Sequence, residues 1–174
     1  PHFLFNSLNN IYTLVYEQSA KAPQAVLKLS ELIRYMLYEK KDSVPLMREW
    51  SYVQNFIGLQ QLRFDHELPV ILELKGDAEA ASIPPYLLIP FAENAFKHGD
   101  FNDPSSPLIF KVDVKGKTIV FETQNKINHH NKEQSGGVGL NNVKKRLELL
   151  YPGKHSLDII LNDTIFKAQL HLYN

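Results

Sequence analysis

The spacing of apolar residues changes near residue 65, and this change constrains the fold more than any other feature. Before it, apolar side chains recur at alternating steps of three and four, as on one face of a helix. After it, several short segments alternate apolar and polar residues with a period of two, as strands do. We therefore predict two regions, a helical one at residues 1–65 and a mixed helix and strand domain at residues 66–174.

The helical region carries a heptad-like apolar seam. The seam consists of Phe5, Leu8, Tyr12, Val15, Val26, Leu29, Ile33 and Met36. Pro23 is expected to interrupt or kink it, and a second helix is predicted from about Met47 to Phe64. The two helices favour an antiparallel hairpin, which alone would bury little apolar surface. We expect a second copy to complete a four-helix bundle as a homodimer; the alternative is that the seam packs on the chain's own second domain.

The second region predicts an α+β fold. Strands are expected at residues 68–74, 108–114, 119–123, 157–161 and 165–170. One helix is expected to start at 82–85, to bend at Pro90 and to stop at Gly99 in a left-handed conformation, and another to span Asn141 to Tyr151. A polar stretch at residues 124–137 is expected to be mobile. The pattern indicates an α/β sandwich, with a mostly antiparallel sheet and helices on one face.

Composition excludes several classes of function. The formal net charge is zero, so nothing attracts nucleic acid electrostatically. There is no cysteine, which excludes disulfides, cysteine metal sites and thiol catalysis. No apolar run is long enough to cross a bilayer. Because the chain begins with Pro1 and not with methionine, we expect a fragment that meets a membrane only through missing upstream segments.

The segment Glu93 to Gly99 is the first candidate site. Asn94, Lys97 and His98 are spaced i, i+3 and i+4, which places them on one helix face. An amide oxygen suits Mg²⁺, and a lysine on the same face can neutralise phosphate charge. Glu93 could accept a proton or hold a metal-bound water. The alternative is an ordinary helix end, where His98 is favourable at the negative end of the dipole.

Two further segments are candidates. Gly136, Gly137 and Gly139 precede a predicted helix that Asn141 or Asn142 could cap, and glycines before a helix start favour anion binding. The basic residues at 144–146 would suit a nearby anion, although a solvated basic face is the alternative for at least one of them. His2 lies outside the apolar seam and is either a solvated residue or a nucleophile, which neutral imidazole can be near pH 7.

These segments occur in the order seen in LytS-like sensor histidine kinases, which the chain resembles. The similar segments are 1–9, 52–57, 61–64, 93–99 and 136–147. The resemblance implies a helical dimerisation and phosphoacceptor region followed by an ATP-binding sandwich of the gyrase, chaperone and histidine kinase type. It also implies the cytoplasmic portion of an inner or plasma membrane protein, which passes phosphoryl groups to a response regulator, often of the LytTR type.

The resemblance assigns roles to individual residues. His2 is the phosphoacceptor, Asn94 is the Mg²⁺ ligand, and Gly137 and Gly139 form the phosphate-side hinge. The residues implied for binding Mg²⁺-ATP are Asn94, Lys97, His98, Asn125, Gly137, Gly139, Leu140 and Asn142. The expected reaction is autophosphorylation on His2 followed by transfer to a regulator aspartate.

The sequence departs from the family pattern in two places. Many relatives carry an Asp-Asn-Gly-x-Gly turn whose aspartate binds adenine, whereas Asn125 stands here in a segment without glycine. Classical kinases carry an acid after the histidine, where Phe3 stands here, so Glu93 is offered as the proton acceptor across the domain interface. Two rivals follow: a non-catalytic dimeric signalling module with a degenerate nucleotide site, and a gyrase-type ATPase, against which Pro90 argues by replacing the hydrolytic glutamate.

Overall fold

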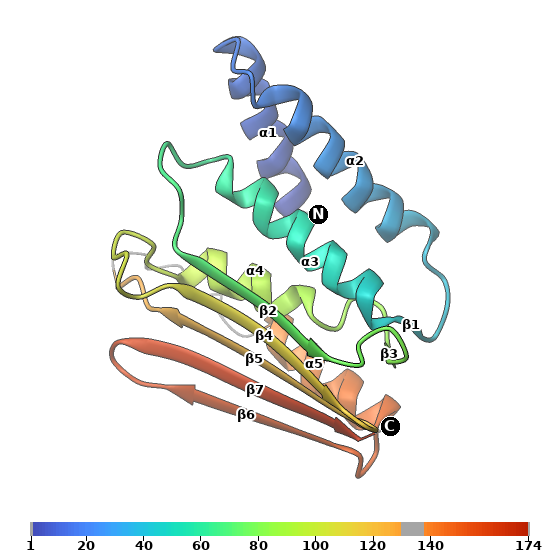
Figure 1. The fold of residues 1–174 in the computed structure, drawn as a ribbon. Coiled ribbons are helices and arrows are strands. Elements are labelled where there is room, and N and C mark those ends of the chain that lie inside the picture. Colours follow the sequence, from blue (N-terminus) through green and yellow to red (C-terminus); the bar gives the residue numbers. More distant parts are fainter. Residues whose placement is uncertain (1, 130–137, 174) are drawn as a thin grey trace.

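The computed structural model describes residues 2–129 and 138–173. Its helices are α1 (His2–Tyr16), α2 (Ala22–Tyr38), α3 (Leu46–Gln61), α4 (Ile89–His98) and α5 (Val138–Leu150). Its strands are β1 (Val44–Pro45), β2 (Val70–Gly76), β3 (Ser82–Ile83), β4 (Leu108–Lys115), β5 (Thr118–Lys126), β6 (His155–Leu161) and β7 (Ile165–Tyr173). Figure 1 shows α1 and α2 farthest from the sheet, with α3 between them and α4.

The helical region contains three helices in its described part, where the sequence predicted two. Gln18 adopts a left-handed φ of 52°, and the amide of Ser19 bonds to the carbonyl of Leu14 at 2.8 Å, which closes the turn after α1. Pro23 lies in the first turn of α2, where its missing N–H costs no helical hydrogen bond. Of the two predicted outcomes, an interruption or a kink, the structure shows an interruption, and α1 and α2 form a hairpin that packs beside α3.

The main sheet has the strand order β2-β4-β5-β7-β6. Strands β2 and β4 are parallel, and the other neighbouring pairs are antiparallel. The hairpin between β4 and β5 turns at Gly116, whose φ of 58° suits glycine. The prediction of a mostly antiparallel sheet is confirmed. β1 and β3 form a separate small pair beside α3.

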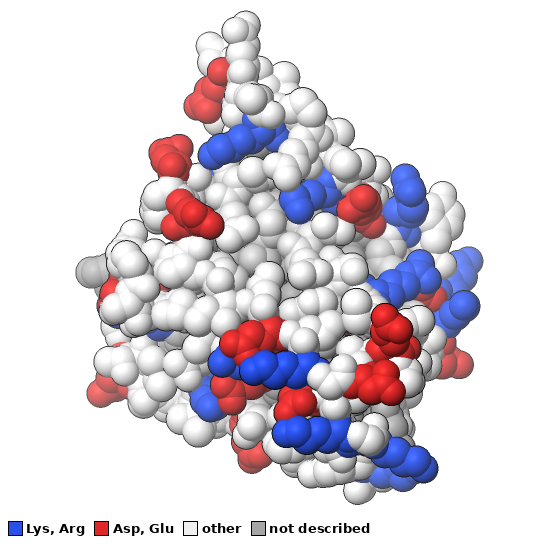
Figure 2. Space-filling view, viewed as in Figure 1, with Lys and Arg blue, Asp and Glu red and all other residues white. Residues whose placement is uncertain are grey.

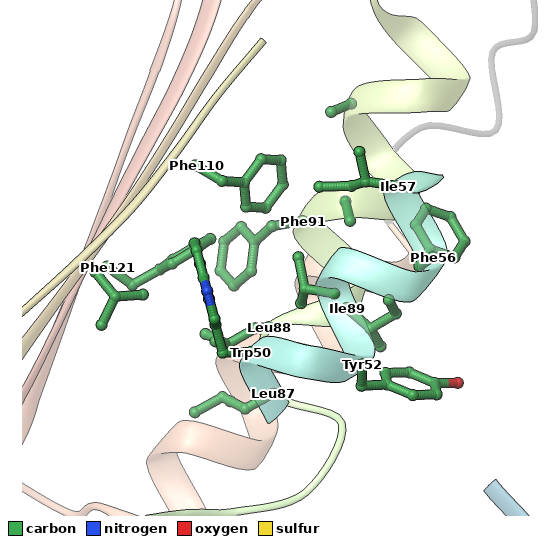
Figure 3. Packing of buried hydrophobic residues seen from close by; sticks show 14 of the residues in the cluster. Trp50, Tyr52, Phe56, Ile57, Leu87, Leu88, Ile89, Phe91, Phe110 and Phe121 are labelled. Carbon is green, nitrogen blue, oxygen red and sulfur yellow. The ribbon is translucent and has the colours of Figure 1, made fainter. Parts of the chain in front are cut away.

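One face of the sheet carries the core and the other faces solvent. Figure 3 shows Trp50 of α3 and Phe91 of α4 directed toward Phe110 and Phe121 of the sheet. The Phe91 and Phe121 rings lie 5.0 Å apart, an ordinary aromatic contact. The opposite face carries interleaved acidic and basic side chains, seen in the lower half of Figure 2; they include the Lys167–Glu122 pair at 2.9 Å. The predicted arrangement of helices on one face is confirmed.

The start and stop of α4 differ from the sequence prediction. Ser82 and Ile83 belong to β3, and the helix begins at Ile89, so Pro90 lies in the first turn and causes no bend. Gly99 is extended, with a φ of −78°, and is not a left-handed stop. A Cβ at Gly99 would lie 2.4 Å from the Ala95 carbonyl oxygen and 2.7 Å from the Phe101 ring. Glycine is thus needed there for close approach.

Helix α5 begins earlier than predicted. Its first residue is Val138, so Asn141 and Asn142 lie inside the first turns and do not cap the helix. Segment 130–137, which contains Gly136, Gly137 and most of the polar stretch expected to be mobile, lies outside the described residues. In the part of the chain that is described, no helix combines the length and the apolar character that a membrane span requires.

Candidate functional site

Helix α4 presents a polar face opposite its core face. Ile89, Phe91, Ala92 and Ala95 are buried, whereas Glu93 is exposed. Asn94, Lys97 and His98 are partly exposed. The prediction that Asn94, Lys97 and His98 share one helix face agrees with this pattern, since the buried residues lie on the other side. Lys97 and His98 also occupy the last turn, where positive charge is favourable.

The end of β5 meets the end of α4. The amide of Asn128 donates to the His98 carbonyl at 2.8 Å, and the amide of Asp100 donates to the Lys126 carbonyl at 2.9 Å. Lys126 Nζ lies 3.0 Å from an Asp103 carboxyl oxygen, which ties the loop after α4 to the same strand. The hydrogen bonds of Asp103 to Ser105 and Lys126 hold its pKa well below the usual range. Residue 125 is thereby fixed close to the last turn of α4.

Asn125 is a buried amide with one free acceptor. Its side chain is 1% exposed, and Nδ2 donates to the Lys126 carbonyl at 2.9 Å. Oδ1 has no hydrogen-bond partner among residues 2–129 and 138–173. An unsatisfied buried acceptor is costly, so this oxygen suits a ligand group that donates a hydrogen bond. An amino group such as that of adenine fits this requirement.

Thr123 is a candidate that sequence reasoning missed. It lies two residues before Asn125 on β5, at a buried position of the same strand face. Its hydroxyl also has no partner within the described part of the chain. The available signal was a polar residue at an inward position of an alternating strand, where an apolar one is the rule.

The start of α5 lies beside the start of α4. A Cβ built on Gly139 would lie 3.9 Å from the side chain of Pro90, and Leu140 is buried in the core. Asn142 is exposed. Arg146 donates from Nη1 to the Pro85 carbonyl at 2.5 Å, so one of the three basic residues at 144–146 makes an internal contact. Gly137, predicted with Gly139 as a hinge, lies outside the described residues.

The carboxyl of Glu93 is disposed to accept a proton. The residue is exposed, yet partial desolvation by its neighbours raises its pKa above the ordinary value. Tyr52 of α3 is close enough for the Glu93 charge to act on it: burial, and then that charge, raise the pKa of the Tyr52 hydroxyl. A carboxylate with a raised pKa holds a proton more readily than a solvated one.

His2 is the first residue of α1, and its side chain lies outside what the structure describes. Its neighbour Phe3 is described, and the Phe3 ring lies 4.8 Å from Phe56 of α3. The Phe56 ring in turn lies 6.0 Å from the ring of Phe96 on α4. Phe96 follows Glu93 by about one helical turn. This series of rings places the first turn of α1 next to α3 and toward α4.

A magnesium ion could be held in this region by the amide oxygen of Asn94 together with phosphate oxygens and water. Within residues 2–129 and 138–173, no three side chains of His, Cys, Asp or Glu gather into a metal site. Asn94 is partly exposed on α4 and offers an amide oxygen, so a metal bound beside it would take that oxygen as a protein ligand, with phosphate oxygens and water at the remaining positions. Mg²⁺ is commonly bound in this way next to nucleotide phosphates.

Comparison with known sequences finds similarity to histidine kinases. A family model described as histidine kinase matches residues 1–68. The sensor protein LytS of Staphylococcus saprophyticus is 28% identical over 174 residues, covering 91% of this chain and 29% of that protein. An uncharacterised sensor-like histidine kinase of Staphylococcus epidermidis is 27% identical over 164 residues, covering 87% and 32%. The chain thus spans less than a third of these relatives.

A third relative is more similar in sequence over a shorter stretch, and two solved structures share the fold. The sensor protein kinase HptS of Staphylococcus aureus is 34% identical over 99 residues, covering 57% of this chain and 19% of that protein. The histidine kinase AdeS of Acinetobacter baumannii has a TM-score of 0.53 at 12% identity, covering 98% and 92% of the two chains. The histidine kinase domain of Erythrobacter litoralis EL346 has a TM-score of 0.52 at 12% identity, covering 99% and 91%.

Proposed function

We propose that this chain, a LytS-like histidine kinase by sequence and fold, phosphorylates His2 from ATP and passes the phosphoryl group to an aspartate of a response regulator. The fold of histidine kinase catalytic domains implies ATP as the donor. The observation that carries the proposal is the series of rings from Phe3 through Phe56 to Phe96, since it brings the first turn of α1 toward α4, on the side of that helix where Glu93 lies.

The reaction is an in-line displacement. A neutral imidazole nitrogen of His2 attacks the γ-phosphorus, a P–N bond forms, and the P–O bond to the β-phosphate breaks to release ADP. The imidazole proton passes to Glu93, whose raised pKa suits that role. Catalysis then depends mainly on positioning and on neutralising phosphate charge.

The nucleotide contacts are divided between α4, β5 and the start of α5. Asn94 would hold Mg²⁺ through its amide oxygen, and the metal supplies charge neutralisation at the phosphates. Lys97 and His98 lie on the same helix face and contribute positive charge or donors. Asn125 accepts from the adenine amino group through Oδ1, its free acceptor. The phosphate side is assigned to Gly137, Gly139, Leu140 and Asn142.

We assign the phosphoacceptor and dimerisation role to residues 1–65 and the ATP-binding role to residues 66–174. We also propose that the chain is the cytoplasmic part of a membrane sensor. In the relatives named as sensors, the matched region covers only 29% and 19% of the protein, which leaves room for a sensing part there. The regulator is proposed to be of the LytTR type, as the LytS resemblance suggests.

Incubation with γ-labelled ATP and Mg²⁺ tests the proposed function. We expect the protein to take up label that is lost in acid and kept in base, because a phosphoramidate P–N bond hydrolyses in acid. A carboxyl or hydroxyl phosphate would not show this pattern. Release of free phosphate without labelled protein would instead support a hydrolase, and neither label nor free phosphate would support a binding module; both results would overturn the kinase assignment.

A homodimer is proposed from the exposed face of the α1 and α2 hairpin. Phe5, Leu8, Tyr12 and Val15 are all more than half exposed, so the seam on α1 does not pack on the chain's own second domain. Further exposed apolar side chains on this hairpin are Tyr16, Val26, Leu27, Leu37 and Tyr38. Since contiguous exposed apolar residues mark interaction surfaces, a second copy covering this face would complete a bundle.

Replacing Tyr12 with glutamate should weaken the dimer, because a charge would then be buried in an apolar interface. Tyr12 is 71% exposed and stacks on Tyr16, so the monomer should remain folded. Sedimentation across a range of concentrations measures the change, with Tyr173→Glu, an exposed tyrosine on β7, as the matched control. A wild-type chain that stays monomeric, or a Tyr12→Glu dimer as strong as the wild type, would contradict the proposal.

A further inference from the structure

Glu49 of α3 is a fully buried carboxyl, 0% exposed, that the mechanism above does not use. Its Oε1 accepts from the Tyr35 hydroxyl at 2.5 Å and from the Tyr86 amide at 2.7 Å. Its Oε2 accepts from the amides of Leu87 and Leu88 at 3.1 and 3.3 Å. All four partners donate, so an ionised carboxylate satisfies every one of them. A neutral amide in its place would set its own hydrogens against these donors.

The three amides belong to the turn from which α4 starts. Leu88 is the N-cap residue of α4 and offers no capping side chain, and Pro90 supplies no N–H. Tyr86 adopts a left-handed φ of 60°, which is unfavourable for a tyrosine unless its surroundings hold it. Glu49, from a different helix, thus holds the three amides that immediately precede the first residue of α4, where the helix dipole also favours a negative charge.

The same turn is bonded to two other helices. The Tyr86 hydroxyl donates to the Tyr35 carbonyl of α2 at 2.8 Å. Arg146 of α5 donates to the Pro85 carbonyl at 2.5 Å. The rings of Tyr35 and Tyr86 lie 5.1 Å apart, so the contact is packed as well as hydrogen-bonded. Residues 85–88, here called the α4 entry turn, therefore join α2, α3, α4 and α5.

We propose that Glu49 is a positioning residue that fixes the α4 entry turn and thereby sets α4 relative to the helical hairpin that begins with His2. The proposal rests on the proposed kinase function. Helix α4 stays on the sheet through its own apolar contacts, such as Phe91 with Phe121. Loss of Glu49 should therefore change the alignment of the two reacting parts more than the binding of ATP, and misalignment lowers the rate of transfer.

Glu49→Gln tests the proposal by separating rate from affinity. The rate of His2 phosphorylation at saturating ATP should fall about tenfold or more, while the Kd for Mg²⁺-ATP, measured by calorimetry, should change less than about threefold. Tyr35→Phe is the matched control: it removes one donor to Glu49 but leaves the three amide contacts, so its rate should fall much less. Weaker ATP binding with an unchanged rate, or equal losses in the two variants, would overturn the proposal.

A second variant covers the case in which Glu49→Gln does not fold. Tyr86→Phe keeps the amide contacts with Glu49 and removes only the hydroxyl bond to α2. It should lower the rate about threefold at unchanged ATP affinity, since the entry turn is then less firmly joined to the hairpin. An unchanged rate in Tyr86→Phe would count against positioning through this turn.

A measurement without phosphorylation separates this proposal from the proposed function. The chain contains no cysteine, so Gln24→Cys on α2 and Lys115→Cys on β4, both exposed and outside the proposed dimer face, can each carry a spin label. Labelled protein diluted with unlabelled protein should give one narrow distance distribution, and Glu49→Gln should broaden it. An unbroadened distribution in Glu49→Gln would overturn positioning even if the wild type is a kinase; a broadened one supports it even if no phosphohistidine forms.

Discussion

His2→Ala is expected to abolish phosphorylation of the chain completely while leaving Mg²⁺-ATP binding intact. The imidazole is the proposed nucleophile, and alanine offers no atom that could form the P–N bond. ATP binding should persist because the proposed nucleotide contacts lie on α4, β5 and α5, whereas His2 opens α1. The measurement is uptake of label from γ-labelled ATP, beside calorimetric binding of a non-hydrolysable ATP analogue.

His66→Ala is the control for that experiment. His66 is an exposed histidine in the segment between α3 and β2, so its loss should change neither label uptake nor nucleotide binding. Label retained by His2→Ala and lost in His66→Ala would assign the phosphoacceptor role to His66, after α3, and not to His2. Label retained by both variants would end the assignment of His2.

Asn94→Ala is expected to weaken Mg²⁺-dependent ATP binding by roughly 100-fold, because losing even a residue that only supports a metal ligand can lower metal affinity by up to about 100-fold. Phosphorylation at ordinary ATP concentrations should then be lost. The amide oxygen is the proposed protein ligand of the metal, and alanine provides no oxygen in its place. The side chain is partly exposed on α4, so the fold should be unaffected. Calorimetry with and without Mg²⁺ separates the loss of metal binding from a loss of nucleotide contacts.

The control for Asn94→Ala is Asn102→Ala, in the loop after α4. Asn102 is exposed and donates to an Asp100 carboxyl oxygen at 2.8 Å. Its replacement by alanine should therefore leave ATP binding unchanged. Equal ATP affinity for Asn94→Ala and the wild type in the presence of Mg²⁺ would show that the metal role of Asn94 is wrong. A loss that is the same with and without Mg²⁺ would assign Asn94 to the nucleotide and not to the metal.

Local patterns predicted much of the fold. The alternation in residues 108–123 predicted β4 and β5, because strand side chains alternate whatever lies around them. The spacing of Asn94, Lys97 and His98 placed them on one side of α4 for a similarly local reason. Helix boundaries were less predictable: α4 began at Ile89 because residues 82–83 pair with β1, a contact that no local pattern reveals.

The two hydrophobic periods were enough, by themselves, to indicate a helical region and an α+β sandwich, and the order of the motifs carried the resemblance to LytS-like histidine kinases, since side-chain periodicity and short motifs are properties of neighbouring residues. Only the tertiary structure decided that Glu49 binds the amides of the α4 entry turn, 37 to 39 positions away, and that Phe3 reaches Phe56. It also decided that the buried Oδ1 of Asn125 has no hydrogen-bond partner among the described residues. These facts depend on which distant segments pack together, and packing is set by the whole core.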